Sequence, residues 1–261
     1  MREELSMNAI DVHCHLSHTI KRGAKLGNIL KKAERNGVVA FIDSPVYVDD
    51  YKQSIRYHRQ NPNIFVTLGA PPANYHELNI DEIIEQIKYY AEKKEIVAIG
   101  EVGLDYYWVK DQNIREQQHE TFKRFIDLAN ELQLPLVIHS RNAEEDATKD
   151  LLQAEVPVIM HSYSGSIETA LECVNRGYYI SITTAITLRR KYQKIAKAIS
   201  LENILTETDS PYMSPFPDIK RNEPGNVIYA VKEIAKLKEL DEKEVGKVTV
   251  ANAKKAFKIL E

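Results

Sequence analysis

Short apolar runs rich in β-branched residues recur along the chain, separated by longer stretches with helical spacing. The runs cover Ala9–Cys14, Val38–Asp43, Ile64–Gly69, Ile96–Glu101, Pro135–His139, Pro157–His161, Tyr178–Ile182 and Asn203–Thr206. Most of them are nearly continuous in apolar character, as expected for strands that are covered on both faces. The pattern therefore predicts eight parallel strands.

The stretches between the runs carry apolar residues three and four positions apart. This spacing predicts helices over residues 80–90, 122–132 and 227–234. Asn142, followed by Glu145, and Asp241, followed by Glu244, resemble helix N-caps. Strands that alternate with helices favour a parallel α/β fold, and eight strands is the number that a closed (β/α)8 TIM barrel needs. An open, doubly wound sheet also fits this pattern.

The length of 261 residues fits one large barrel, which typically has about 250 residues. No Gly/Ser linker, low-complexity segment or repeat interrupts the chain, so we expect a single domain over residues 1–261. Hydrophobic residues make up 43% and charged residues 28%, which is ordinary for a globular protein. The net charge of −3 argues against an extended nucleic-acid coat protein, but a cleft that binds a few nucleotides needs only local cations.

The two cysteines, Cys14 and Cys173, cannot form a disulfide framework, which fits a reducing compartment. The N-terminal residues contain no signal-peptide pattern, and no run of eighteen apolar residues occurs. We therefore expect a cytoplasmic protein without a membrane span. Nothing in the sequence implies an obligate protein partner.

Candidate chemistry gathers where the predicted strands end. His13 and His15 alternate with Cys14 at the end of the first strand, so the two imidazoles point the same way and can share a metal ion. Asp11 can orient the pair from behind, while Cys14 points to the opposite face. A bare His-x-His pair is otherwise compatible with polar residues at a strand end.

Glu101 ends another apolar strand, where an unpaired carboxylate would be costly, and glycines flank it on both sides. A carboxylate there can bridge two cations, although a glutamate in a surface loop is the simpler alternative.

His139 and His161 each follow an apolar strand. Either one alone is compatible with a hydrogen-bonded core histidine, whereas two at successive strands favour metal ligands. Arg141 adds a planar fork of donors that suits phosphate or carboxylate, unless it forms a surface salt bridge.

Glu207 and Asp209 follow the last strand on one face, where one carboxylate can bind metal and the other can handle protons. An acidic turn is the alternative. Lys220, Arg221 and Asn222 lie in a loop beside that face. In a barrel the carboxyl ends of the strands meet at one face, so these groups predict a site for two divalent ions. Zinc suits the imidazoles, and manganese or magnesium suits the oxygens.

Six motifs in order resemble the TatD family of metal-dependent deoxyribonucleases, a branch of the metallo-dependent hydrolases. They are DVHCHL, GEVGLDYY, VIHSR, HSYSGS, ETDSPY and KRNEP, and the segment VTVANAKKAF is similar to the closing helix of that family. The resemblance extends over nearly the whole chain. It implies a TIM barrel that hydrolyses DNA phosphodiester bonds with a metal-activated water, starting from an end of the DNA strand.

The resemblance also implies a role for each residue. His13, His15 and Asp209 would bind one ion, His139 and His161 the second, and Glu101 would bridge the two. Asp209 would also activate the attacking water. The residues implied around the substrate phosphate are Glu207, Arg141, Arg221 and Asn222.

Two other functions remain open at this point. A metal-activated water attacks carbon as readily as phosphorus, so an amide or ester hydrolase such as an aminoacyl-tRNA deacylase fits the same ligands. A barrel that has lost its metal and serves as a binding scaffold is the non-enzymatic alternative, which the intact set of predicted ligands disfavours.

Overall fold

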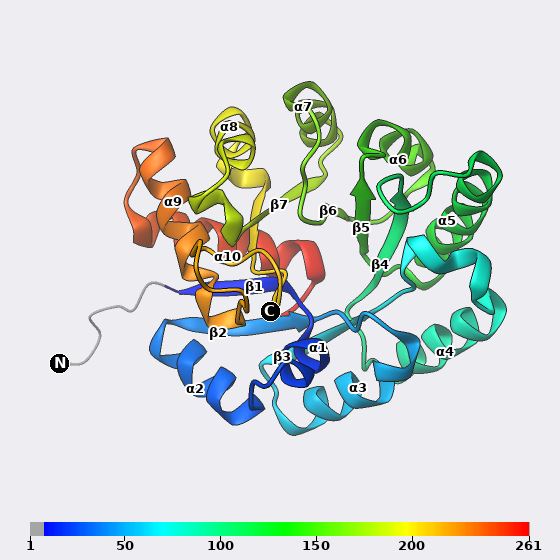
Figure 1. The fold of residues 1–261 in the computed structure, drawn as a ribbon, viewed down its shortest axis with the longest axis horizontal. Helices are drawn as coiled ribbons and strands as arrows, with labels where there is room; N and C mark the ends of the chain where they lie inside the picture. Colours follow the sequence, from blue (N-terminus) through cyan, green and yellow to red (C-terminus); the bar gives the residue numbers. More distant parts are fainter. Residues whose placement is uncertain (1–7, 261) are drawn as a thin grey trace.

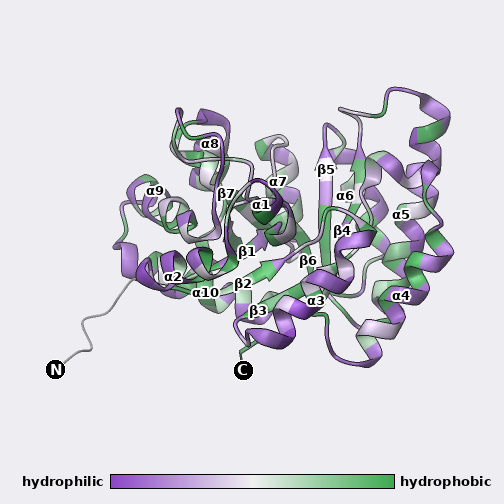
Figure 2. Cartoon of the chain, turned by 60° about the horizontal axis from the view of Figure 1, so that its bottom comes forward, coloured by the Kyte–Doolittle hydropathy of each residue, from purple (hydrophilic) through white to green (hydrophobic). Residues whose placement is uncertain are grey.

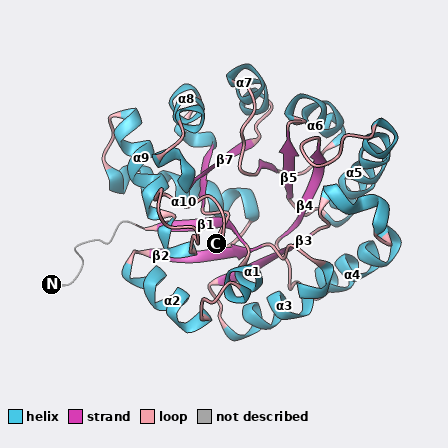
Figure 3. Cartoon of the chain, viewed as in Figure 1, coloured by secondary structure: helices cyan, strands magenta, loops and turns pink. Residues whose placement is uncertain are grey.

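The computed structural model describes residues 8–260, which form a barrel of eight parallel strands with helices outside it (Figure 1). Each strand is hydrogen-bonded to the next in chain order, and loops join each strand to the helix that follows it (Figure 3). The predicted (β/α)8 TIM barrel is confirmed. Residues 1–7 and 261 of the predicted domain lie outside the described part. The strands are β1 Ala9–Cys14, β2 Val38–Asp43, β3 Ile64–Leu68, β4 Ala98–Asp105, β5 Leu136–Arg141, β6 Val158–Met160, β7 Tyr179–Thr183 and β8 Ile204–Glu207.

Strand β4 differs most from its predicted range. The apolar run stops at Glu101, but β4 continues to Asp105 because it stays paired with β5 as far as Arg141. Gly103 allows this pairing, since a Cβ atom at its φ of +140° would lie 2.0 Å from the carbonyl oxygen of His139. Glu101 therefore lies within a strand rather than at its end.

The helices alternate with the strands as predicted. The expected helices at 80–90 and 122–132 lie within α4 (Ile80–Glu92) and α5 (Gln112–Leu132), and the one at 227–234 corresponds to α9 (Ile228–Lys238), which begins one residue later. Asp241 caps α10 by accepting a hydrogen bond from the backbone of Lys243. The predicted cap at Asn142 is wrong: α6 begins after Ala143, and Asn142 occupies a turn with φ of +57°. The helices are α1 Leu16–Lys21, α2 Leu26–Arg35, α3 Tyr51–Gln60, α4 Ile80–Glu92, α5 Gln112–Leu132, α6 Glu144–Asp150, α7 Ile167–Asn175, α8 Arg190–Ala198, α9 Ile228–Lys238 and α10 Glu242–Phe257.

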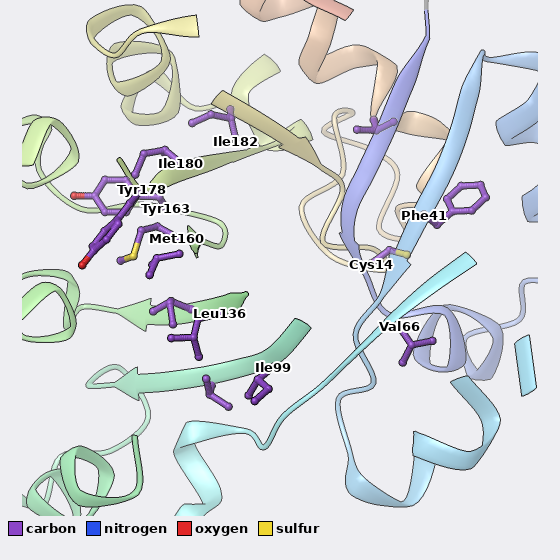
Figure 4. Close-up of a cluster of buried hydrophobic side chains, with 14 of the residues drawn as sticks. Cys14, Phe41, Val66, Ile99, Leu136, Met160, Tyr163, Tyr178, Ile180 and Ile182 are labelled. Carbon is purple, nitrogen blue, oxygen red and sulfur yellow. The ribbon is translucent and has the colours of Figure 1, made fainter. Parts of the chain in front are cut away.

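Two apolar layers hold the fold together. The outer layer lies between the strands and the surrounding helices and includes Cys14, Phe41 and Met160 (Figure 4). The inner layer joins side chains from the strands, such as Val12 and Ile42, to Phe257 near the end of α10. In Figure 2 much of the sheet is hydrophobic, and many hydrophilic residues lie on the outer helices.

A shift of register in β1 sets the direction of the first histidines. Ile10 and Val12 pack in the inner layer, but the pairing with β2 shifts between Asp11 and Cys14, and Cys14 packs in the outer layer. Irregularities of this kind re-aim side chains at strand ends. The predicted outward direction of Cys14 is confirmed.

Buried Asp11 joins the two strands that close the barrel. Its carboxylate accepts hydrogen bonds from the backbone and the hydroxyl of Thr208, at 2.8 and 2.5 Å, and from the backbone of His13 at 3.4 Å. Burial raises the pKa of Asp11 well above its usual value, and the Thr208 hydrogen bonds only partly oppose this. Asp11 thus fixes the backbone of β1 against the segment after β8, and the described contacts do not include a bond to an imidazole ring.

A chain of polar side chains connects α5 and α6 to the loop after β4. His119 bonds Asp150 through Nδ1 and the hydroxyl of Tyr106 through Nε2, at 2.8 Å, and that hydroxyl donates to Asp146 at 3.0 Å. The hydrogen bond to Asp150 raises the pKa of His119 above its ordinary value. The protonated ring can donate to both neighbours at once.

We expect His119→Gln to destabilise the fold more at pH 5.5 than at pH 9. Because the folded pKa is raised, the stabilisation is complete below the unfolded value and is lost as the pH rises through the folded value. The site is partly exposed, so the loss at low pH should be about 0.5–1 kcal/mol. Denaturant unfolding at both pH values measures it, with His76→Gln as the control. An equal loss at both pH values would contradict this assignment.

None of the helices between residues 8 and 260 has the length and apolar character needed to cross a bilayer.

Candidate metal centre

The structure brings the predicted metal ligands together at the opening formed by the carboxyl ends of the strands, which we call the mouth. They come from five of the eight strands or from the residues directly after them, on both sides of the barrel. They are His13 in β1, His15 after it, Glu101 in β4, His139 in β5, His161 after β6 and Asp209 after β8.

One group of possible ligand atoms comprises His13, His15 and Asp209, with these atoms within 4.8 Å of one another. Nε2 of His15 lies 3.1 Å from Oδ1 of Asp209. The backbone holds this pair in place, because the amide of Asp209 donates to the carbonyl of His13 and the amide of His15 donates to that of Ser210.

A second group comprises His13, Glu101 and His161 within the same limit. Oε2 of Glu101 lies 3.4 Å from Nε2 of His13, and Oε1 lies 3.8 Å from Nε2 of His161. The rings of His13 and His161 stack with centroids 3.6 Å apart. His13 therefore belongs to both groups, and Glu101 faces histidines from both sides of the barrel.

His139 lies beside these groups rather than within one of them. Its Nδ1 is 2.5 Å from Oε1 of Glu101, and its Nε2 is 2.8 Å from Oδ2 of Asp105. Glu101 and Asp105 are four residues apart on one strand and hold the imidazole between them. A cation beside Glu101 is thus within reach of His139 once the ring gives up its hydrogen bond to that carboxylate.

Three of the four histidines share one arrangement. One ring nitrogen faces Asp209 or Glu101, and the other bonds to an acceptor behind the ring: the Ser44 carbonyl for His15, Asp105 for His139 and Glu207 for His161. Nδ1 of His161 is 3.0 Å from Oε1 of the fully buried Glu207. Metal-binding histidines in proteins are oriented in this way, by a hydrogen bond from the nitrogen that does not face the metal.

His13 tests whether the cluster fits a metal. The residue is 1% exposed, and neither of its ring nitrogens has a hydrogen-bond partner among residues 8–260. Burying such a group without a partner is unfavourable. A divalent ion would give one of these ring nitrogens a partner, and His13 belongs to both groups of possible ligands, so the residues present fit the divalent ions that the sequence predicts.

The charges in the cluster complement one another. Burial raises the pKa of Glu101, but the charges of His161 and His139 outweigh burial and hold this pKa well below its usual value. For Asp209 burial also raises the pKa, but the hydrogen bond from His15 and the charges of the neighbouring histidines together outweigh burial and lower the pKa. Both carboxylates are therefore ionised near neutral pH, as metal ligands must be.

The residues predicted around the substrate phosphate have different surroundings. Arg141 is exposed at the end of β5, with its guanidinium 3.7 Å from the centre of the Tyr107 ring. Glu207 lies behind His161 and is fully buried, so it does not line the mouth. Arg221 donates to the carbonyl of Arg22 and to Glu223.

Asn222 is also fully buried. Its amide nitrogen donates to Thr184 and to two carbonyl groups, and its amide oxygen accepts from Glu223 and Asn226. In this arrangement the side chain holds the loop after β8 against the barrel. Its polar atoms are hydrogen-bonded within the protein rather than directed at the mouth.

Sequence reasoning did not assign a role to Asp105 or to the carbonyl of Ser44. Asp105 could have been found, because Glu101, Gly103 and Asp105 alternate along one strand and so share a face. Ser44 acts through its backbone, so its residue type carries no signal.

Comparison with known proteins places these residues in a wider group. The family model described as TatD related DNase matches residues 10–258. A metal-dependent hydrolase of Methanocaldococcus jannaschii, uncharacterized in function, is 35% identical over 95% of this chain and 96% of its own length. The human deoxyribonuclease TATDN3 is 33% identical over 95% of this chain and 94% of its own length.

Solved structures share the fold. The Escherichia coli TatD homolog YjjV superposes with a TM-score of 0.86 at 23% identity, covering 98% of this chain and 100% of the other. A TatD family hydrolase of Entamoeba histolytica gives a TM-score of 0.84 at 22% identity, covering 97% and 99%.

Proposed function

The chain belongs to the TatD related DNase family, and we propose that this metal-dependent hydrolase is a deoxyribonuclease that cleaves DNA phosphodiester bonds, acting from a strand end. The observation that carries the proposal is the cluster at the mouth, where histidines from β1, β5 and β6 face two ionised carboxylates. Exposed aromatic side chains with an arginine beside them at the mouth, such as Trp108 and Arg141, favour a nucleic acid over other phosphodiesters.

We assign two divalent ions to the cluster, either zinc or the oxygen-preferring manganese or magnesium. His13, His15 and Asp209 would hold one ion, and His139 and His161 would hold the other, with Glu101 between them. When bound, such a pair of ions lowers the pKa of a water and stabilises the charge that develops on a phosphoryl group.

The chain's own residues would divide the remaining work. Asp209 is the carboxylate placed to accept a proton from the attacking water, because the hydrogen bond and charge of His15 keep it ionised. Arg141, exposed at the mouth, can donate to phosphate oxygens. Glu207, Asp105 and the Ser44 carbonyl orient the imidazoles from behind.

A labelled oligonucleotide tests the proposal. We expect single-stranded DNA to be shortened stepwise in the presence of Mg²⁺, Mn²⁺ or Zn²⁺, and the end that carries the label reports the direction. The double variant His139→Ala/His161→Ala should lack this activity, whereas His76→Ala, outside the cluster, should retain it. Hydrolysis of aminoacyl esters without cleavage of DNA, or equal rates for the wild type and the double variant, would refute the proposal.

A further inference from the structure

Exposed aromatic side chains gather around the mouth. Among residues 8–260 the exposed aromatic residues are Tyr47, Tyr89, Tyr107, Trp108 and Tyr212. Tyr89 lies on α4, away from the strand ends, and the other four follow the carboxyl ends of β2, β4 and β8. Exposed rings of this size are costly to leave in water, so their concentration at one face points to a ligand with flat apolar surfaces.

The first platform consists of Tyr107, Trp108 and Arg141. Trp108 is 67% exposed, its ring meets that of Tyr107 edge to face, and Arg141 lies over both rings. The backbone of Trp108 donates to Asp105, at 2.8 Å, and Asp105 also bonds His139. This platform is therefore joined directly to the Glu101 side of the metal centre.

The second platform consists of Tyr212, His18 and Arg22. The guanidinium of Arg22 lies 4.9 Å from the centre of the Tyr212 ring, and the Tyr212 hydroxyl contacts Nδ1 of His18 at 3.1 Å. Tyr212 is 37% exposed, and its ring centre is 6.1 Å from that of His15. This platform adjoins the Asp209 side of the metal centre.

The two platforms lie on opposite sides of the mouth. The first follows β4 and β5, and the second follows β8 and β1. Because the strands are arranged in chain order round an eight-stranded barrel, β4 faces β8 and β5 faces β1 across it. The metal ligands lie between the platforms.

We propose that the two platforms are base-stacking subsites that receive nucleobases on either side of the scissile phosphate of an unpaired strand. The inference rests on the proposed function and adds to it where the strand is held. Each platform pairs an aromatic face with a guanidinium, so it offers a stacking surface for a base and a cation for the adjoining phosphate. Bases in a duplex are stacked on one another and do not present their faces in this way.

The fluorescence of Trp108 tests the first subsite directly, because it is the one tryptophan in the sequence. We expect oligo(dT) to quench its emission, both in EDTA and with divalent metal and a phosphorothioate strand that resists hydrolysis. A strand of equal length that carries deoxyribose phosphates without bases should leave the emission nearly unchanged.

Substitutions test the pair of subsites. Trp108→Ala and Tyr212→Ala should each weaken the binding of a labelled strand about tenfold, as loss of one stacked base does. Trp108→Phe should restore most of the affinity. Tyr212→Ala should leave the maximal quenching of Trp108 intact. Tyr89→Ala, which removes an exposed ring with its own lysine contact on α4, is the matched control and should bind as the wild type does.

Four results would overturn the proposal: no quenching by oligo(dT), quenching by the base-free strand equal to that by oligo(dT), binding unchanged in both platform variants, or self-association of the protein that Trp108→Ala abolishes. The last would assign the rings to a contact between copies of the chain. Quenching does not require cleavage, so it separates this proposal from the deoxyribonuclease activity. DNA cleavage without quenching of Trp108 would refute only the proposed subsites. Quenching without cleavage would refute only the proposed deoxyribonuclease activity.

Discussion

Replacing Glu101 with alanine is expected to lower the content of both metal ions per chain and to reduce the rate of DNA hydrolysis by more than a hundredfold. Loss of a partner that only orients a ligand costs about 10–100-fold, and Glu101 is placed as a ligand itself. Its two oxygens face His13 on one side and His139 and His161 on the other. Elemental analysis of the purified variant gives the metal content per chain, and a labelled strand gives the rate.

His139→Ala provides the comparison for this prediction, because His139 lies on one side of Glu101 and should affect mainly one ion. Glu82→Gln, an exposed glutamate on α4, is the control for the loss of a carboxylate. Circular dichroism and thermal melting establish that each variant is folded. Equal metal loss in Glu101→Ala and His139→Ala would contradict the bridging position of Glu101.

Replacing Glu207 with alanine should weaken metal binding about 10–100-fold while leaving much of the activity recoverable at saturating metal. The sequence placed Glu207 among the groups that act on substrate or protons. In the structure it is fully buried and faces Nδ1 of His161, so we infer that it acts by orienting that imidazole.

The dependence of the rate on metal concentration separates these two roles. A positioning residue shifts the concentration of metal needed, and a proton-transfer residue lowers the maximal rate at any concentration. Glu207→Gln, which keeps an acceptor for the His161 ring, should lose less affinity than Glu207→Ala. Asp105→Asn, the matching change behind His139, should behave like Glu207→Gln. If the maximal rate of Glu207→Ala stays low at saturating metal, Glu207 acts on substrate or protons, as the sequence analysis predicted.

The sequence predicted the fold and the cluster of candidate metal ligands because both follow from patterns of apolar and polar residues within single strands. Apolar runs mark strands that are buried on both faces, and polar residues that follow such runs meet at one face of a barrel. His13 and Asp209 are 196 positions apart, yet this argument alone places them at the same mouth. The end of β4 was missed because Gly103 and Asp105 interrupt the apolar run while the backbone pairing continues.

The sequence could not distinguish residues that line the mouth from those that support it. Glu207 and Asn222 belong to the same motifs as Asp209 and Arg221, but both are buried, each against a neighbour distant in the sequence. Which side of a loop faces the ligand depends on these tertiary contacts and not on residue type. For the same reason the pairing of Tyr212 with His15 and Arg22 became visible only in three dimensions.

The inner apolar layer determines how a substrate can travel. Ala253, Ala256 and Phe257 of α10 pack with side chains of the strands inside the sheet, so the barrel interior is filled with protein. The interior of the barrel below the mouth is therefore packed, and a substrate can reach the candidate metal centre only from the mouth. Under the proposed function, a DNA strand cannot thread through the barrel as it is shortened, and each released nucleotide must leave through the mouth by which the strand entered.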